Sequence, residues 1–204
     1  MRPRRSRSAL PILSSPSTTA DETLAGAAAS GSRAAFARLV DRYAGRVVAT
    51  LERRLGDHNA ALDVGQETWI RVFRGLPSFD VDKSFRSWLF AIALNAARDE
   101  GRRRQRSPVD YVDELPQSLS HSASDSRAHE DRQAIDRALA GIAEPYRTAV
   151  VLVDSEGLNY QEAAASCDCK LGTMKSRVAR GRAAFREQWR KVCGETETTK
   201  RKSL

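Results

Sequence analysis

Residues 158–188 constrain the fold most strongly, because they combine a short helix, a tight turn and a longer basic helix. Asn159 is a favourable N-cap, and Glu162 stands at the third helical position, which is the spacing of a capping box. Asp168 falls at the turn, where a left-handed backbone is needed and Asp is tolerated better than most residues. The segment therefore predicts a helix-turn-helix whose second helix runs from about Gly172 to Gln188.

The second helix of this motif has two chemically different faces. Its apolar or small residues are Met174, Val178, Gly181 and Phe185. The opposite side and its flanks carry Lys170, Thr173, Lys175, Ser176, Arg177, Arg180 and Arg182. Arg and Lys can hydrogen-bond guanine edges or pair with phosphates, and Ser and Thr suit phosphates and short base contacts. A solvated basic helix is the alternative, but the short helix and tight turn beside it favour DNA binding.

The rest of the chain also has helical periodicity, and no strand-like alternation is found. Apolar residues recur at steps of three and four between Phe36 and Leu51, which predicts an amphipathic helix. Further helices are expected over 60–75 and 84–104, the latter with Ser84 as N-cap. Helical patterning begins near residue 21 and returns at residue 130. The expected fold is therefore all-α.

Changes in composition divide the chain into two small helical domains. We expect residues 1–20 to form a basic, disordered tail, and residues 107–129, which are rich in Ser and Asp, to form a flexible linker. The expected domains are residues 21–106 and 130–190, followed by a C-terminal tail at 191–204.

Charge and cysteine content limit the classes of function. A formal net charge of +8 and a pI of about 9.9 favour a polyanionic partner, although many basic proteins merely have solvated basic faces. The cysteines Cys167, Cys169 and Cys193 form neither a disulfide framework nor a zinc motif, so we expect no metal and no cofactor. No apolar run could span a bilayer. The chain lacks a convincing nucleophile–base set, which argues against an enzyme.

Four segments resemble bacterial extracytoplasmic-function (ECF) sigma factors. Residues 157–164 and 172–182 resemble region 4, residues 63–74 resemble region 2.2, and residues 85–99 resemble regions 2.3 and 2.4. The resemblance implies two all-helical domains that bind the RNA polymerase core and recognise the −10 and −35 promoter elements. It places the −35 contacts on the basic face described above, at Lys170, Thr173, Lys175, Ser176, Arg177 and Arg180.

The resemblance also assigns a polymerase contact. Asp63, Gln66 and Glu67 match the region 2.2 positions that dock on the clamp coiled coil of the largest polymerase subunit. Asp63 and Glu67 share one helix face, where they can meet basic groups. The chain departs from the family pattern at Leu62, Val64 and Gly65. Gly65 is expected to cost helix stability on the order of 1 kcal/mol.

Contacts to the −10 element and its melted strand follow from the same resemblance. The loop of residues 79–84 matches the segment that captures a flipped-out base, which needs polar groups and a flat wall. Phe85 and Trp88 match aromatic positions of region 2.3, although aromatics three apart on a helix are usually core. The residues implied are Phe79, Asp80, Lys83, Ser84, Trp88, Asn95, Arg98, Arg102 and Arg103.

The resulting expectation is a cytoplasmic sigma factor that recruits polymerase and favours promoter opening without covalent catalysis. Anti-sigma partners are common in the family, but no residue here identifies one. A DNA-binding regulator that does not bind polymerase is the main alternative, and residues 63–99 argue against it.

Overall fold

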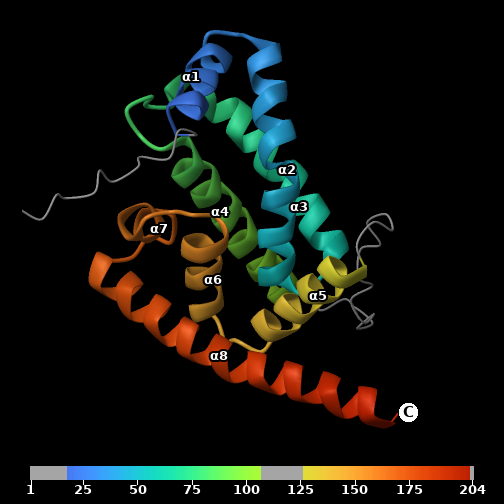
Figure 1. Cartoon of the computed structure of the whole chain (residues 1–204). Coiled ribbons are helices and arrows are strands. Elements are labelled where there is room, and N and C mark those ends of the chain that lie inside the picture. Colours follow the sequence, from blue (N-terminus) through green and yellow to red (C-terminus); the bar gives the residue numbers. More distant parts are fainter. Residues whose placement is uncertain (1–17, 107–125, 203–204) are drawn as a thin grey trace, which may run out of the picture.

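The computed structural model describes residues 18–106 and 126–202, which contain helices and no β-strand (Figure 1). The N-terminal domain comprises α1 (Thr18–Ala29), α2 (Arg33–Leu55), α3 (His58–Gly75), the 3-10 turn η1 (Leu76–Ser78) and α4 (Phe85–Arg106). The C-terminal domain comprises α5 (Ser126–Ala140), α6 (Tyr146–Val150), the π-helical segment η2 (Val151–Ser155), α7 (Tyr160–Ser166) and α8 (Leu171–Lys202). The all-α prediction is confirmed. Most of the predicted tail and linker, residues 1–17 and 107–125, lies outside the described residues.

Polar caps set the starts of the N-terminal helices. The Ser32 hydroxyl accepts a hydrogen bond from the backbone N–H of residue 35, and the Asp57 carboxylate accepts one from residue 60. The Ser84 hydroxyl accepts from the Ser87 backbone N–H at 3.2 Å, as expected for the start of α4. Glu22 of α1 adds a second cap, because its carboxylate accepts from the Phe85 N–H at 2.9 Å. This contact ties α1 to α4.

Gly65 lies where α3 packs closely on α2. A Cβ atom built there would stand 3.2 Å from Cγ2 of Val48, and Gly65 itself is buried. The glycine therefore lets the two helices pack closely, and this packing offsets the helix stability that is lost because glycine is a poor helix former. This packing gives the departure from the family pattern at residue 65 a physical reason.

The helix-turn-helix has the predicted local chemistry. The Asn159 side chain accepts from the backbone N–H groups of residues 161 and 162, and the Glu162 carboxylate accepts from the Asn159 N–H, which completes a capping box. Asp168 has a φ of 50°, in the left-handed region. The second helix is longer than predicted, because α8 continues past Gln188 to Lys202. Helix α8 packs against α5, and the rings of Phe185 and Trp189 stack with their centroids 5.9 Å apart.

The two domains share one hydrophobic core rather than standing apart. Buried residues of α2, α3 and α4 belong to the same cluster as Leu152, Leu158 and Met174 of the C-terminal domain. Helix α7 packs against α4, and α5 and α6 contact α2 (Figure 1). Within the described residues, the two predicted domains are in direct contact.

Candidate nucleic-acid interface

Helix α8 packs through its apolar side, and this packing leaves its basic side facing solvent. Met174 and Val178 are fully buried, and a Cβ on Gly181 would lie 2.4 Å from Val150 Cγ2, so α6 fixes the rotation of α8. The predicted residues Thr173, Ser176 and Arg180 are exposed, and Arg177 is half-buried. Lys170, just before the helix, and Lys175 on its flank are also exposed.

The basic side chains of this surface differ in the groups that they contact within the chain. Arg180 donates to the Tyr146 hydroxyl at 3.1 Å, and Arg182 forms an ion pair with Asp154 at 2.6 Å. Within the described residues, no acidic group lies within ion-pair distance of Lys170, Lys175 or Arg177. Their positive charge is thus available to an external anion such as a phosphate.

Aromatic rings line the base of the loop at residues 79–84. The ring centroid of Phe79 lies 4.9 Å from that of Trp88 and 5.8 Å from that of Phe85. Phe85 is fully buried and so belongs to the core, whereas Phe79 and Trp88 are only partly buried. Asp80 and Lys83 of the same loop are exposed. The loop thus combines a flat apolar wall with polar groups, which is what an unstacked base requires.

The other predicted −10 residues lie on α4, and their contacts differ. Arg98 donates to the side-chain oxygen of the exposed Asn95, its neighbour one turn earlier. Arg103 pairs with Glu100 at 2.8 Å. Arg104 bridges Glu100 and Asp57, the N-cap of α3, at 2.9 and 2.8 Å, which gives it a structural role.

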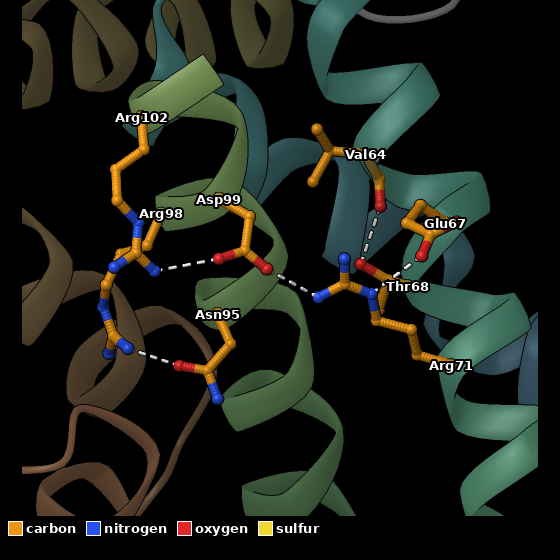
Figure 2. A network of polar contacts seen from close by, with 8 residues as sticks. All are labelled: Val64, Glu67, Thr68, Arg71, Asn95, Arg98, Asp99 and Arg102. Atoms are coloured by element: carbon orange, nitrogen blue, oxygen red, sulfur yellow. Dashed lines mark hydrogen bonds and ion pairs between the residues drawn. The ribbon is translucent and has the colours of Figure 1, made fainter. Parts of the chain in front are cut away.

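A chain of ion pairs connects α3 to α4 (Figure 2). Arg71 donates through Nε to Glu67 at 2.8 Å and through Nη1 to Asp99 at 2.9 Å. Asp99 also accepts from Arg102 at 2.9 Å. Hydrogen bonds from Arg71 and then Arg102 lower the pKa of Asp99, so it remains ionised. The network connects Glu67, a predicted polymerase contact, to Arg102, a predicted DNA contact.

A groove of about 290 Å³ lies along this network. Its lining residues are Asp63, Val64, Glu67, Arg71, Ala96, Asp99, Glu100 and Arg103. The structure thereby brings Asp63 and Glu67 together, whereas Gln66 is exposed outside the groove lining. Sequence reasoning missed Arg71 and Asp99, because their pairing depends on how α3 and α4 pack.

An apolar surface beside these acids was also missed. Ile70 is 45% exposed and Phe73 is 59% exposed, although both lie on α3 with the predicted polymerase contacts. Phe36 of α2 packs edge-on against Phe73, with 5.3 Å between ring centroids. The signal in the sequence was the position of Ile70 and Phe73 outside the buried stripe that contains Val64 and Val72. Such exposed apolar groups are typical of interfaces.

The cysteines occupy packed positions. All three are free thiols, and burial raises the pKa of Cys167 to about 11. Within the parts of the chain that the structure describes, no three His, Cys, Asp or Glu side chains are grouped to hold a metal ion. None of the helices described combines the length and apolar character needed to cross a bilayer.

Comparisons with known proteins agree with this geometry. Residues 39–107 match the family described as Sigma-70 region 2, and residues 132–185 match Sigma-70, region 4. The ECF RNA polymerase sigma-E factor of Escherichia coli K12 is 33% identical over 176 residues, which cover 81% of this chain and 92% of that protein. The ECF RNA polymerase sigma factor SigE of Mycolicibacterium smegmatis is 39% identical over 168 residues, 78% of this chain and 63% of that protein.

Two solved structures share the fold over most of the chain. CnrH in complex with the cytosolic domain of CnrY has a TM-score of 0.60 and 30% identity, covering 82% of this chain and 96% of that one. The sigma factor RpoE of Bartonella quintana, in complex with the anti-sigma factor NepR, has a TM-score of 0.62 and 26% identity, covering 76% and 96%.

Proposed function

The chain belongs to the ECF family of RNA polymerase sigma factors, and we propose which of its surfaces perform each step of promoter recognition. Region 4 is the C-terminal domain, and its α8 inserts into the major groove of the −35 element. Region 2 is the N-terminal domain, which docks on polymerase through α3 and holds the −10 element with α4 and the loop at residues 79–84.

The observation that carries the −35 assignment is the outward basic surface of α8. Lys170, Lys175 and Arg177 have no acidic partner within the described residues, while Met174 and Val178 fix the opposite side of the helix. Arg177 is suited to a bidentate contact with a guanine edge, and the lysines are suited to phosphates. The helix-turn-helix therefore presents an anion-binding surface with a fixed orientation.

Polymerase docking combines acidic and apolar groups on α3. Asp63, Gln66 and Glu67 offer hydrogen-bond acceptors toward the clamp coiled coil, and Ile70 and Phe73 offer exposed apolar area next to them. Charged groups steer a partner and fix its register, whereas buried apolar groups supply most of the affinity. We therefore assign Ile70 and Phe73 to the same interface.

The −10 assignment uses the aromatic wall and the polar groups of residues 80–84. Phe79 and Trp88 provide stacking surface for an unpaired base, and Asp80, Lys83 and Ser84 provide polar groups for its edge. On α4, Asn95 and Arg98 face the DNA, while Arg102 and Arg103 contact phosphates. Selective binding of the melted strand shifts the duplex toward the open state.

Family membership supports a proposal for the location, the catalytic role and the regulation of this chain. Sigma factors of this family are not catalytic, and we propose that the polymerase performs all chemistry while this chain acts beside it in the cytoplasm. The titles of the two similar structures describe complexes with CnrY and with the anti-sigma factor NepR. We propose that this chain is also held by an anti-sigma factor.

Binding to purified core polymerase tests the docking assignment. Replacement of Asp63 and Glu67 by alanine is expected to weaken core binding and to leave binding of a −35 duplex unchanged. The matched control replaces Asp131 and Glu187, two exposed acids of the C-terminal domain, and thus changes the net charge equally. Normal core affinity in the Asp63/Glu67 variant would overturn the assignment.

A further inference from the structure

Helix α1 contacts the segments on both sides of the loop at residues 79–84. It packs against η1, which precedes the loop, and against α4, which follows it (Figure 1). A loop held at both ends by a third element has fewer accessible conformations, so it has less conformational entropy to lose on binding. The contacts of α1 therefore bear on how the loop receives a base.

The end of the loop is held by Glu22 of α1. Its carboxylate oxygen Oε1 accepts a hydrogen bond from the backbone N–H of Phe85 at 2.9 Å. Phe85 is the first residue of α4, and the first N–H groups of a helix have no acceptor within that helix. The positive end of the helix dipole also favours a carboxylate at this position. Glu22 thus fixes the point at which the loop enters α4.

The middle of the loop lies against Gly26 of α1. The backbone N–H of Lys83 donates to the Asp80 carbonyl at 3.0 Å, which closes a turn with Val81 at its second position. A Cβ atom built on Gly26 would lie 3.3 Å from Cγ1 of Val81, which is closer than ordinary van der Waals contact. Glycine therefore leaves the space that the turn occupies, and a larger residue at position 26 would push against Val81.

The two contacts lie on one face of a helix that is itself well anchored. Glu22 and Gly26 are four residues apart, so they share a face of α1. Asp21, next to Glu22, is only 3% exposed, and its carboxylate accepts hydrogen bonds from the Tyr43 hydroxyl and the Arg42 guanidinium of α2. The face of α1 that contacts the loop is thus held in place by α2.

The aromatic wall of the loop depends on the same anchor. The ring of Phe79 lies 5.8 Å from that of Phe85, whose backbone is held by Glu22, and 4.9 Å from that of Trp88. An unstacked base needs the wall and the polar groups of the loop in a fixed relative position. A loop that is already ordered binds more tightly, because the cost of ordering it is not taken from the binding free energy.

We infer that Glu22 and Gly26 are positioning residues for base capture, which hold the loop in its receiving conformation without touching the base. The inference rests on the proposed function, because it requires the loop to capture a base. Only one oxygen of Glu22 is used: Oε2 is buried and has no hydrogen-bond partner among the described residues. Glutamine keeps an accepting oxygen, so it should replace Glu22 without losing the contact to α4.

DNA with a missing base tests the role of Glu22. Holoenzyme formed with core polymerase binds a fork-junction DNA with a −35 duplex and a single-stranded −10 segment, and each −10 position is made abasic in turn to locate the captured base. Glu22→Ala should weaken binding of the intact DNA by roughly 2- to 30-fold, the range for loss of one helix cap, and weaken binding of the abasic DNA much less. Glu22→Gln should behave like the unsubstituted chain. The control Asp41→Ala removes an exposed carboxylate of α2 and should change neither affinity.

The outcomes separate positioning from general stability and from the proposed function. If Glu22→Ala weakens binding of the intact and the abasic DNA equally, Glu22 has only a structural role and the inference is wrong. Unchanged binding of both DNAs would also overturn it. If no abasic position weakens binding by the unsubstituted holoenzyme, no base is captured and the proposed −10 assignment fails instead.

A larger residue at position 26 tests the second contact independently. Gly26→Leu should weaken binding of the intact DNA but not of the abasic DNA, and adding Val81→Ala, which removes Cγ1, should restore part of the loss. Leucine is a better helix former than glycine, so thermal denaturation should show no loss of stability. The control is Gly45→Leu of α2, because nothing lies within 4 Å of a Cβ there. A Gly26→Leu holoenzyme that binds both DNAs as tightly as the unsubstituted one would contradict the inference.

Discussion

Arg71 of α3 donates to Asp99 of α4 at 2.9 Å, and this contact links the helix assigned to polymerase to the helix assigned to the −10 element (Figure 2). Glu67 and Arg102 extend the link at either end. The relative placement of the two helices thus depends partly on charged groups at the surface.

Loss of this link is expected to have a small effect on stability. Arg71 and Asp99 are 36% and 49% exposed, so solvent screens their attraction, and Arg71→Ala should lower the free energy of unfolding by at most about 1 kcal/mol. Urea denaturation measures the change. The control is Lys191→Ala, which removes an exposed pair with Glu187 within α8 and should change stability less. A loss of several kcal/mol for Arg71→Ala would show that the network determines the packing.

Two glycines of α8 should respond to alanine in opposite directions. A Cβ at Gly181 would lie 2.7 Å from the Tyr146 carbonyl oxygen, so Gly181→Ala should destabilise the domain by about 1–3 kcal/mol or more. Nothing lies within 4 Å of a Cβ at Gly172, so Gly172→Ala should stabilise it by up to about 1 kcal/mol through helix propensity. Thermal denaturation of both variants measures these two changes in stability. Equal effects would contradict the described packing of α6 on α8.

The −35 surface predicts two kinds of binding defect. Arg177→Ala should weaken binding of a −35 duplex by roughly 1–3 kcal/mol and relax base preference at one position, if Arg177 makes a bidentate guanine contact. Lys175→Ala should weaken all duplexes similarly and reduce the slope of log K against log salt by about 1. Fluorescence anisotropy across a salt series distinguishes a lost base contact from a lost phosphate contact. Unchanged affinity in Arg177→Ala would remove this residue from the interface.

Cys167 should react slowly with alkylating reagents. Burial raises the pKa of its thiol from 9.0 to about 11, so the thiolate fraction at pH 8 falls about a hundredfold. Because the folded state holds this proton more tightly, the stability contributed by Cys167 is present below pH 9 and is lost as the pH rises toward 11. Iodoacetamide labelling followed by peptide mass spectrometry measures the rate, with urea-unfolded protein as the control. Equal labelling in folded and unfolded protein would contradict the partly buried position of Cys167.

Features that depend on neighbouring residues could be predicted from the sequence. The capping box of Asn159 and Glu162, the left-handed Asp168 and the buried side of α8 all follow from spacing within a few residues. The local motifs and the family resemblance also identified the two domains.

Features that depend on long-range packing could not be predicted. Glu156 reads as an ordinary surface acid before a glycine, yet it is buried against Arg46, which is 110 residues away. The role of Gly65 depends on Val48 of another helix, and the contact of α8 with α5 joins two helices that lie far apart in the sequence. In each case the decisive contact joins elements whose relative placement no short sequence pattern specifies.

Single-round transcription with purified core polymerase tests the central claim most directly. Promoters selected from a random library with the reconstituted holoenzyme would provide the template, and core alone would provide the background. We expect RNA only when the chain is present, with loss of transcript when either selected element is scrambled. A chain that binds these duplexes but never directs initiation by the core enzyme would contradict the account.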